Sequence, residues 1–242
     1  MMVLGIETAT RAASVALVSE EEILAEYILS GVKSHAEQLL RGIDQILSDT
    51  GKSLTECAGI AVSVGPGSFT GLRIGVSTAK ALAWAANLPI VGISTLRAMA
   101  ANIPHAAYPI CPVLDARKRE VYTALYKWVE GELQAVIPEQ VVSAADMIHQ
   151  LDRSLKIIFI GNGSRLYQGM IQEQFGKQAE FSPQSHDCPR ASTVASLGLK
   201  RLLAQQFDLV QTLVPTYLRP SDAEINWSQK HGSRSVYLPE NN

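Results

Sequence analysis

The chain has 242 residues, of which 47% are hydrophobic and 18% charged, the composition of a globular protein with a sizeable core. Its formal net charge of -2 lacks the basic excess of a free-standing nucleic-acid binder, although a partner could supply such a surface. The three cysteines, Cys57, Cys111 and Cys188, are widely spaced, which argues against a disulfide framework. With no signal-peptide pattern and no membrane-length apolar stretch, we expect a cytoplasmic protein.

The first half predicts three strands, a helix, a strand, a glycine-rich turn, a second helix, a strand and a further helix. The first helix opens at the capping-box pattern Ser34-His35-Ala36-Glu37 and carries apolar residues at the spacing of one buried face. The predicted strands are 3–8, 13–18, 23–29, 59–64 and 90–93, and the later helices are 72–87 and 95–102.

The second half repeats this order. Strands are predicted at 110–115, 120–126 and 132–137, then a helix at 144–151 and a strand at 156–160. That strand runs into Gly161-Asn162-Gly163-Ser164, which resembles Gly65-Pro66-Gly67-Ser68. The shared order favours duplication over chance and predicts an α/β protein of two βββαβα lobes facing across a cleft. We expect a first lobe over 1–104 and a reduced second lobe over 105–242, with the final helix and tail from about 191 packing back on the first.

The run from Gly65 to Gly75 is the most distinctive motif. A glycine-rich turn between a strand and a helix lets backbone N–H groups approach an anion, and Ser68 or Thr70 can cap the helix. The alternative is a tight turn whose glycines only satisfy positive φ. The run lacks the lysine of a phosphate-binding NTPase loop, and Gly71 comes one residue too late for the dinucleotide fingerprint.

A cleft between two such lobes suits a nucleotide. The turns after the first strand of each lobe, and the two glycine turns, are expected to line it. The candidate residues are Glu7, Thr8, Thr10, Gly65, Gly67, Ser68, Thr70, Asp115, Gly161 and Gly163.

Catalytic and metal-binding patterns are weak. The five histidines, at 35, 105, 149, 186 and 231, never stand four residues apart, so no helical metal pair is expected. Ser68 is not a hydrolase nucleophile, because Pro66 stands where that motif requires glycine. Cys111 lies in an apolar strand and is expected in the core. We therefore predict no catalytic residues.

The helix over 72–87 is apolar almost all round, which indicates burial in its own lobe or against another chain. Its one polar line ends at Trp84, a side chain typical of interface anchors. With the preceding helix it predicts a protein–protein interface in which Ala83→Glu would release monomers and leave the fold intact. The candidate interface residues are His35, Gln38, Leu39, Gly42, Arg73, Val76, Ser77, Ala79, Lys80, Ala83 and Trp84.

The run at 65–75 resembles the signature of the TsaB (YeaZ) family, within the superfamily of actin, sugar kinases and seventy-kilodalton heat-shock ATPases. Weaker similarities at 34–40, 115–122 and 215–219 extend the resemblance over almost the whole chain. Two positions depart from the family pattern. Glu7-Thr8-Ala9 stands where Asp-Thr-Ser is usual, and Ala36 stands where serine is common.

The resemblance implies a non-catalytic partner of TsaD, which transfers threonylcarbamoyl from its adenylate to N6 of the tRNA adenosine beside the anticodon. It also implies TsaE as a third component, a homodimer when TsaD is absent, and contact with tRNA only through TsaD. No intrinsic cofactor is implied, with ATP or ADP at the interface of the complex left open. TsaD-like proteins carry a His-x-x-x-His metal pair where this chain has Ser94 to Met99 without histidine.

Two other functions remain as alternatives. A stand-alone ATPase or kinase would use the cleft with Glu7 and Asp115, and a metal-dependent, glycoprotease-like hydrolase is the weaker option.

Overall fold

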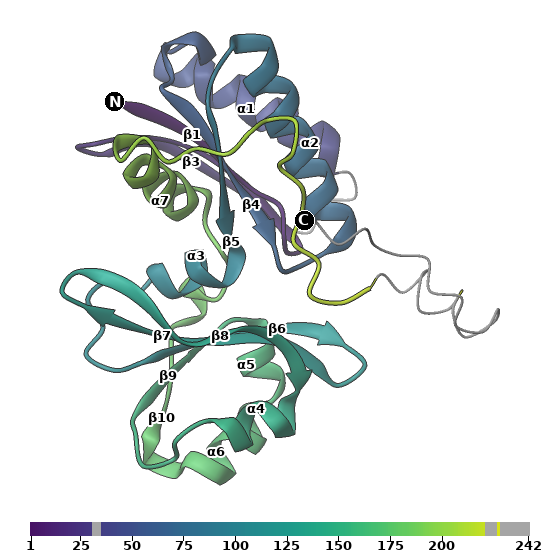
Figure 1. Cartoon of the computed structure of the whole chain (residues 1–242), viewed down its shortest axis with the longest axis vertical. Helices are drawn as coiled ribbons and strands as arrows, with labels where there is room; N and C mark the ends of the chain where they lie inside the picture. The colour runs from purple at the N-terminus through teal and green to yellow at the C-terminus, as the bar shows by residue number, and fades with distance from the viewer. Residues whose placement is uncertain (31–34, 221–226, 228–242) are drawn as a thin grey trace, which may run out of the picture.

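The computed structural model describes residues 1–30, 35–220 and 227, which form two lobes (Figure 1). Each lobe is built on a five-stranded sheet. Within the described residues no helix is long and apolar enough to cross a membrane. The elements of the first half are β1 (Met2–Glu7), β2 (Ala12–Ser19), β3 (Ile23–Ser30), α1 (His35–Thr50), β4 (Gly59–Gly65), α2 (Phe69–Ala86), β5 (Ile90–Ser94) and α3 (Thr95–Ala101).

The second half follows the same plan, with shorter helices. Three 3₁₀ turns, at Leu54–Glu56, Gly176–Gln178 and Gln184–His186, complete the described chain. The elements of the second half are β6 (Ile110–Arg117), β7 (Glu120–Val129), β8 (Glu132–Ser143), α4 (Ala144–Gln150), β9 (Ile157–Ile160), α5 (Asn162–Leu166), α6 (Gln168–Phe175), β10 (Ala179–Phe181) and α7 (Ala191–Leu203).

The two sheets have the same topology, which confirms the predicted duplication. The order is β3-β2-β1-β4-β5 in the first and, read in the same direction, β8-β7-β6-β9-β10 in the second. In each, the first three strands are antiparallel and the last two run parallel to the first. The predicted strands and long helices are present, and a helix follows the second glycine turn as the repeated order requires, although it is divided into α5 and α6. Strand β10 was not predicted. The capping residue proposed at Ser34 lies outside the described residues.

The first sheet is covered on both faces, as the alternation of β1 shows. Leu4 and Ile6 pack with side chains of α1 and α2, and Val3 packs on the other face with α7. Gly5 also faces α7, where an added Cβ would overlap the carbonyl oxygen of Ala191. A side chain at Gly5 would therefore push α7 off the sheet.

The second sheet is covered by one helix that precedes it in the chain and by others that follow β8. Leu96 and Met99 of α3 pack on one face with Ile110 and Leu114 of β6. On the other face, Cys111 and Val113 pack with α4 and α6. The helix after each set of strands thus covers the sheet of the other lobe, α3 on the second and α7 on the first. The boundary at residue 104 stays a prediction.

Candidate functional site

The glycines of the run at 65–75 bring α2 against the turn between β1 and β2. An added Cβ at Gly67 would overlap Ala9, one at Gly71 the carbonyl oxygen of Thr8, and one at Gly75 the Thr8 hydroxyl. The Thr8 hydroxyl donates to the Gly71 carbonyl at 2.8 Å. These contacts hold the start of α2 close against the turn between β1 and β2.

Positive φ accounts for only one of the glycines in this run. Of the four at 65, 67, 71 and 75, Gly65 alone has a positive φ, of 119°. The backbone N–H of Ser68 donates to the Ala9 carbonyl at 2.7 Å, so a donor expected to face an anion is already satisfied. Ser68 caps α2 as predicted, accepting from the Gly71 N–H at 3.3 Å, while Thr70 is exposed on the first helical turn.

Glu7 lies inside the first lobe, with 1% of its surface exposed. The Ala9 N–H and the Ser63 hydroxyl each donate to one of its carboxyl oxygens. Burial outweighs these hydrogen bonds and raises the pKa of Glu7 to about 7. Thr8 is also fully buried, and the Thr10 hydroxyl bonds to the backbone of Ala12. The prediction that Glu7 and Thr8 line an open cleft is therefore wrong, because their side chains turn into the lobe.

The second glycine turn repeats the close approach of the first. Gly161 has a φ of 106°, and an added Cβ at Gly161 or Gly163 would overlap Val113 of β6. The Gly161 N–H donates to the Asp187 carboxylate at 3.0 Å. Asp115 is exposed at the end of β6 and accepts from the Arg117 N–H at 2.9 Å. Asp115 is thus the predicted cleft acid that remains on the surface.

The segment after α7 links the β4–α2 turn of the first lobe to the β6–β7 turn of the second. In Figure 1 it runs, in yellow, across the first lobe to the α2 side and down toward the second lobe. The Thr216 N–H donates to the Val64 carbonyl at 2.7 Å, and the Tyr217 ring centre lies 4.7 Å from that of Phe69. Three residues on, Arg219 donates to the Ala116 carbonyl and pairs with Glu120 at 3.3 Å.

The sequence analysis expected the tail from about residue 191 against the first lobe, but it missed the link to the second lobe. We call residues 211–219 the strap. The only signal in the sequence is Tyr217 followed by Arg219, an aromatic and an arginine two residues apart. So short a pattern does not predict which distant residues these side chains contact.

Five of the predicted interface residues are part of the core of the first lobe. They are buried because they face the sheet or the neighbouring helix, so they are not available to a partner. This corrects the assignment of Leu39, Gly42, Val76, Ala79 and Ala83.

The other interface candidates on α2 differ in whether their side chains are exposed and free of contacts with the rest of the chain. Trp84 is 70% exposed, and Ser77 is exposed on the same face of α2. Arg73 is exposed but donates to the Tyr217 hydroxyl at 3.2 Å, and Lys80 donates to the carbonyls of Gln211 and Leu213. The strap therefore occupies both basic side chains of α2.

On α1, Gln38 is half-buried and Leu40 exposed. The side chain of His35 lies outside what the structure describes.

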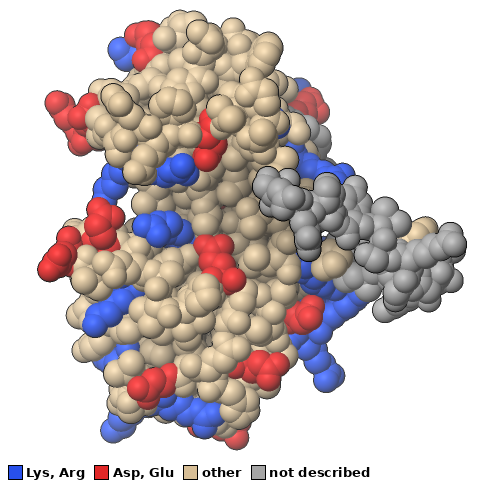
Figure 2. All heavy atoms as spheres, in the orientation of Figure 1, with Lys and Arg blue, Asp and Glu red and all other residues tan. Residues whose placement is uncertain are grey.

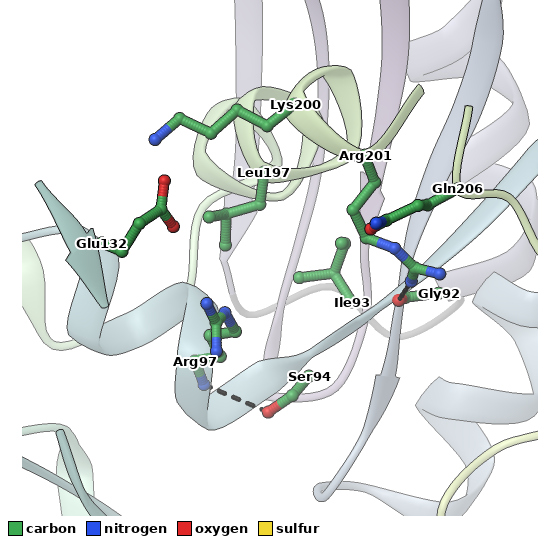
Figure 3. A pocket seen from close by; sticks show the side chains of 9 residues that line it. All are labelled: Gly92, Ile93, Ser94, Arg97, Glu132, Leu197, Lys200, Arg201 and Gln206. Atoms are coloured by element: carbon green, nitrogen blue, oxygen red, sulfur yellow. Dashed lines mark hydrogen bonds between the residues drawn. The ribbon is translucent and has the colours of Figure 1, made fainter. Parts of the chain in front are cut away.

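A pocket of about 470 Å³, which the sequence did not predict, lies where α7, the β5–α3 corner and the start of β8 meet (Figure 3). None of the cleft candidates lines it. Elsewhere in the described chain, no three His, Cys, Asp or Glu side chains gather closely enough to hold a metal ion. The lining residues are Gly92, Ile93, Ser94, Arg97, Glu132, Leu197, Lys200, Arg201 and Gln206.

The duplicated topology and the paired glycine turns place the chain among two-lobed proteins of the actin-like ATPase architecture. A family model described as TsaD, tRNA N6-adenosine threonylcarbamoyltransferase, matches residues 22–227. The chain is 36% identical to the tRNA threonylcarbamoyladenosine biosynthesis protein TsaB of Bacillus subtilis, covering 95% of this chain and 100% of that protein. With TsaB of Escherichia coli the identity is 39%, over 96% of this chain and 99% of the other.

Solved structures agree with these sequence similarities. The chain matches YeaZ from Pseudomonas aeruginosa with a TM-score of 0.76 and 26% identity, over 90% of this chain and 99% of that one. The chain therefore belongs to the family of that model and, within it, to the TsaB proteins of tRNA threonylcarbamoyladenosine biosynthesis.

Proposed function

We propose that this chain is an accessory subunit that pairs with a TsaD-type transferase, and that the partner performs the transfer of threonylcarbamoyl to tRNA. One observation carries the accessory role. The glycine turn that would cradle a phosphate is in contact with the chain's own Thr8 and Ala9. The buried position of Glu7 supports the same conclusion, because a carboxylate that binds Mg²⁺ for phosphoryl transfer must face the nucleotide. On this proposal, any ATP or ADP in the assembly is bound at its interfaces and not in this chain's own cleft.

The outer face of α1 and α2 is the surface we propose for the partner. Trp84 stands 70% exposed on α2, next to the exposed small residues Ala81 and Ala85, and Leu40 is 53% exposed on α1. Large aromatic side chains at the centre of an interface carry much of its binding energy. We propose that a second copy occupies this face when TsaD is absent, that TsaD competes for it, and that TsaE joins the assembled pair.

The experiment is reconstitution with TsaD, TsaE, the threonylcarbamoyl adenylate and tRNA. Trp84→Glu is expected to weaken binding to TsaD by roughly 30-fold, the equivalent of about 2 kcal/mol, and to lower tRNA modification with it. Leu166→Glu is the matched control, because Leu166 is 60% exposed in the second lobe. It is expected to change neither.

Two results would contradict the proposal. Modification that proceeds equally well without this chain would remove the accessory role, and steady ATP turnover by the pure protein would favour the stand-alone ATPase. If Trp84→Glu bound TsaD as tightly as the wild type, the partner surface would lie elsewhere. Ala83→Glu is no longer a suitable probe, because Ala83 is 1% exposed and a charge there would disrupt the core.

A further inference from the structure

The tip of the β6–β7 hairpin carries three basic residues in a row in an unusual backbone conformation. Arg117, Lys118 and Arg119 are exposed and have φ values of 64°, 50° and 65°. Because Arg117 pairs with Glu120, the loop between the strands consists of Lys118 and Arg119, both at positive φ, which is the geometry of a type I′ turn. We call Arg117, Lys118 and Arg119 the basic tip.

This conformation is costly for the residues that adopt it. Residues with a Cβ seldom take a positive φ, and type I′ turns strongly prefer Asn-Gly. Lysine and arginine lack both the small size of glycine and the short polar side chain of asparagine. Backbone strain of this kind persists in proteins mainly where the strained residues have a function. The three charges of the basic tip are therefore the feature that calls for an explanation.

Contacts at the base of the hairpin hold the basic tip in place. The pairing of β6 with β7 is irregular between Asp115 and Arg117, and the carbonyl of the intervening Ala116 accepts from Arg219 of the strap. The Asp115 carboxylate accepts from the Arg117 N–H at 2.9 Å. Irregular pairing of this kind bends a strand and redirects its side chains. The hairpin is thus anchored to the strap at its base, while the side chains of the basic tip are exposed.

The surface formed by the basic tip, the strap and the start of α2 is more basic than the chain as a whole. Among the described residues it has five cations and three carboxylates, an excess of two positive charges in a chain whose net charge is -2. Glu120 is already paired with Arg219 at 3.3 Å, and Asp146 accepts from the Ser143 hydroxyl at 2.7 Å. In Figure 2, Lys and Arg side chains gather at the right-hand edge of the second lobe, where Figure 1 places the end of this hairpin. The cations are Arg73, Arg117, Lys118, Arg119 and Arg219, and the carboxylates are Asp115, Glu120 and Asp146.

Stacked aromatic rings lie beside these cations. The Tyr217 ring centre is 4.7 Å from that of Phe69, and the Arg73 guanidinium is 4.0 Å from the Phe69 ring centre. Tyr217 remains 41% exposed, two residues before Arg219. Surfaces that follow a single-stranded nucleic acid combine cations that bind its phosphates with aromatic rings on which its bases stack. The strap brings both kinds of group next to each other.

We propose that the basic tip and the adjoining strap contact the backbone of tRNA at a single-stranded loop. The inference rests on the proposed function, because the TsaD-type partner performs the transfer and this chain would hold the tRNA beside it. The basic tip would bind phosphate oxygens, and Tyr217 would stack on an unpaired base. The resemblance implied contact with tRNA only through TsaD, and the basic tip adds a direct contact.

The experiment measures the affinity of the complex with TsaD for unmodified tRNA, by fluorescence anisotropy at several salt concentrations. The triple variant Arg117→Gln, Lys118→Gln, Arg119→Gln is expected to bind tRNA about tenfold more weakly or worse. Its affinity should also depend less steeply on salt, because fewer phosphate contacts release fewer counterions. The affinity for TsaD, measured separately, should not change.

The matched control removes the same number of charges from the second lobe at exposed positions outside the basic tip. It is the triple variant Lys127→Gln, Arg153→Gln, Lys177→Gln, which should bind tRNA as the wild type does.

The double variant Lys118→Asn, Arg119→Gly separates the charge of the turn from its shape. Asn-Gly is the preferred sequence of a type I′ turn, so this variant keeps the hairpin and relieves its strain. We expect its midpoint of urea unfolding to rise while its tRNA binding weakens. A variant that is more stable but binds less tightly would show that the strain is retained for the charges.

Three results would overturn the proposal. These are unchanged tRNA affinity in the variant of the basic tip, an equal loss in the control, and a loss of TsaD affinity in the variant of the basic tip, which would make this turn a protein contact. Failure of the proposed function would look different, because the wild type itself would then not bind TsaD. The same titration of the chain without TsaD would still test the basic tip.

Discussion

Two buried threonines show how differently one side chain can contribute to stability. Thr8 and Thr95 are both 0% exposed, but the Thr8 hydroxyl donates to the Gly71 carbonyl at 2.8 Å and the Thr95 hydroxyl has no partner among the described residues. Valine replaces the hydroxyl with a methyl group of similar shape. We expect Thr8→Val to lower the free energy of unfolding by about 1–3 kcal/mol, and Thr95→Val to leave it unchanged or raise it by up to about 1 kcal/mol. Equal losses in urea unfolding of the two variants would contradict this.

The buried carboxyl of Glu7 makes stability depend on pH. Its pKa is raised from 4.5 to about 7 by burial, so the folded state keeps the proton that the unfolded state releases above pH 4.5. The contribution of Glu7 is therefore most favourable below pH 4.5 and is lost as pH rises through 7. Near and above pH 7, the burial of Glu7 lowers the free energy of unfolding by roughly 3 kcal/mol relative to its value at low pH.

Glu7→Gln provides the measurement of that cost. A glutamine is neutral at every pH and keeps an acceptor for the Ala9 N–H, so the variant should be more stable than the wild type at pH 8 and similar to it at pH 4.5. Urea unfolding at several pH values compares the two. A constant difference between them over that range would show that Glu7 does not titrate between folded and unfolded states.

At the scale of single elements, the sequence predicted what depends on neighbouring residues. Short apolar runs bounded by turn or polar residues predicted β1 and β2, the helical spacing predicted α1, and the repeated order predicted the second lobe. Strand β10 was missed because its three residues hold too little periodicity to identify it.

The same limit explains the errors at the candidate site. A helix that is apolar nearly all round does not show which face meets the sheet, so Ala79 and Ala83 were assigned to a partner although they belong to the core. The glycines of the turn need close contact with Thr8, which lies 63 residues before Gly71 in the chain. The sequence predicted either an anion site or a positive-φ turn. Positive φ accounts for Gly65, whereas Gly67, Gly71 and Gly75 are explained by a tertiary contact that local sequence does not reveal.

At the scale of the whole molecule, the two repeats are interlocked. Because α3 packs on the second sheet and α7 on the first, neither lobe completes its core with consecutive residues alone. Ala98 of α3 also packs in the cluster that contains α7, so the two exchanged helices meet at the junction. The two lobes are therefore joined by these helices and also by the strap.

The last prediction concerns that strap. Arg219 is largely buried, donates to the Ala116 carbonyl and pairs with Glu120, so Arg219→Gln removes the charged link between the strap and the second lobe. We expect a loss of about 1–3 kcal/mol in the free energy of unfolding. Hydrogen exchange should quicken at residues 115–120 and 214–219 but not in β1 or β9.

Arg153→Gln is the control for this experiment, because Arg153 is an exposed arginine that contacts only His149, at 3.2 Å, among the bonds of the described residues. An exposed pair of this kind contributes little to stability, so exchange should match the wild type. If Arg219→Gln also left exchange at 115–120 unchanged, the helices α3 and α7 alone would hold the lobes together. The strap would then be a surface segment whose ordering follows from the first lobe, through Thr216 and Tyr217.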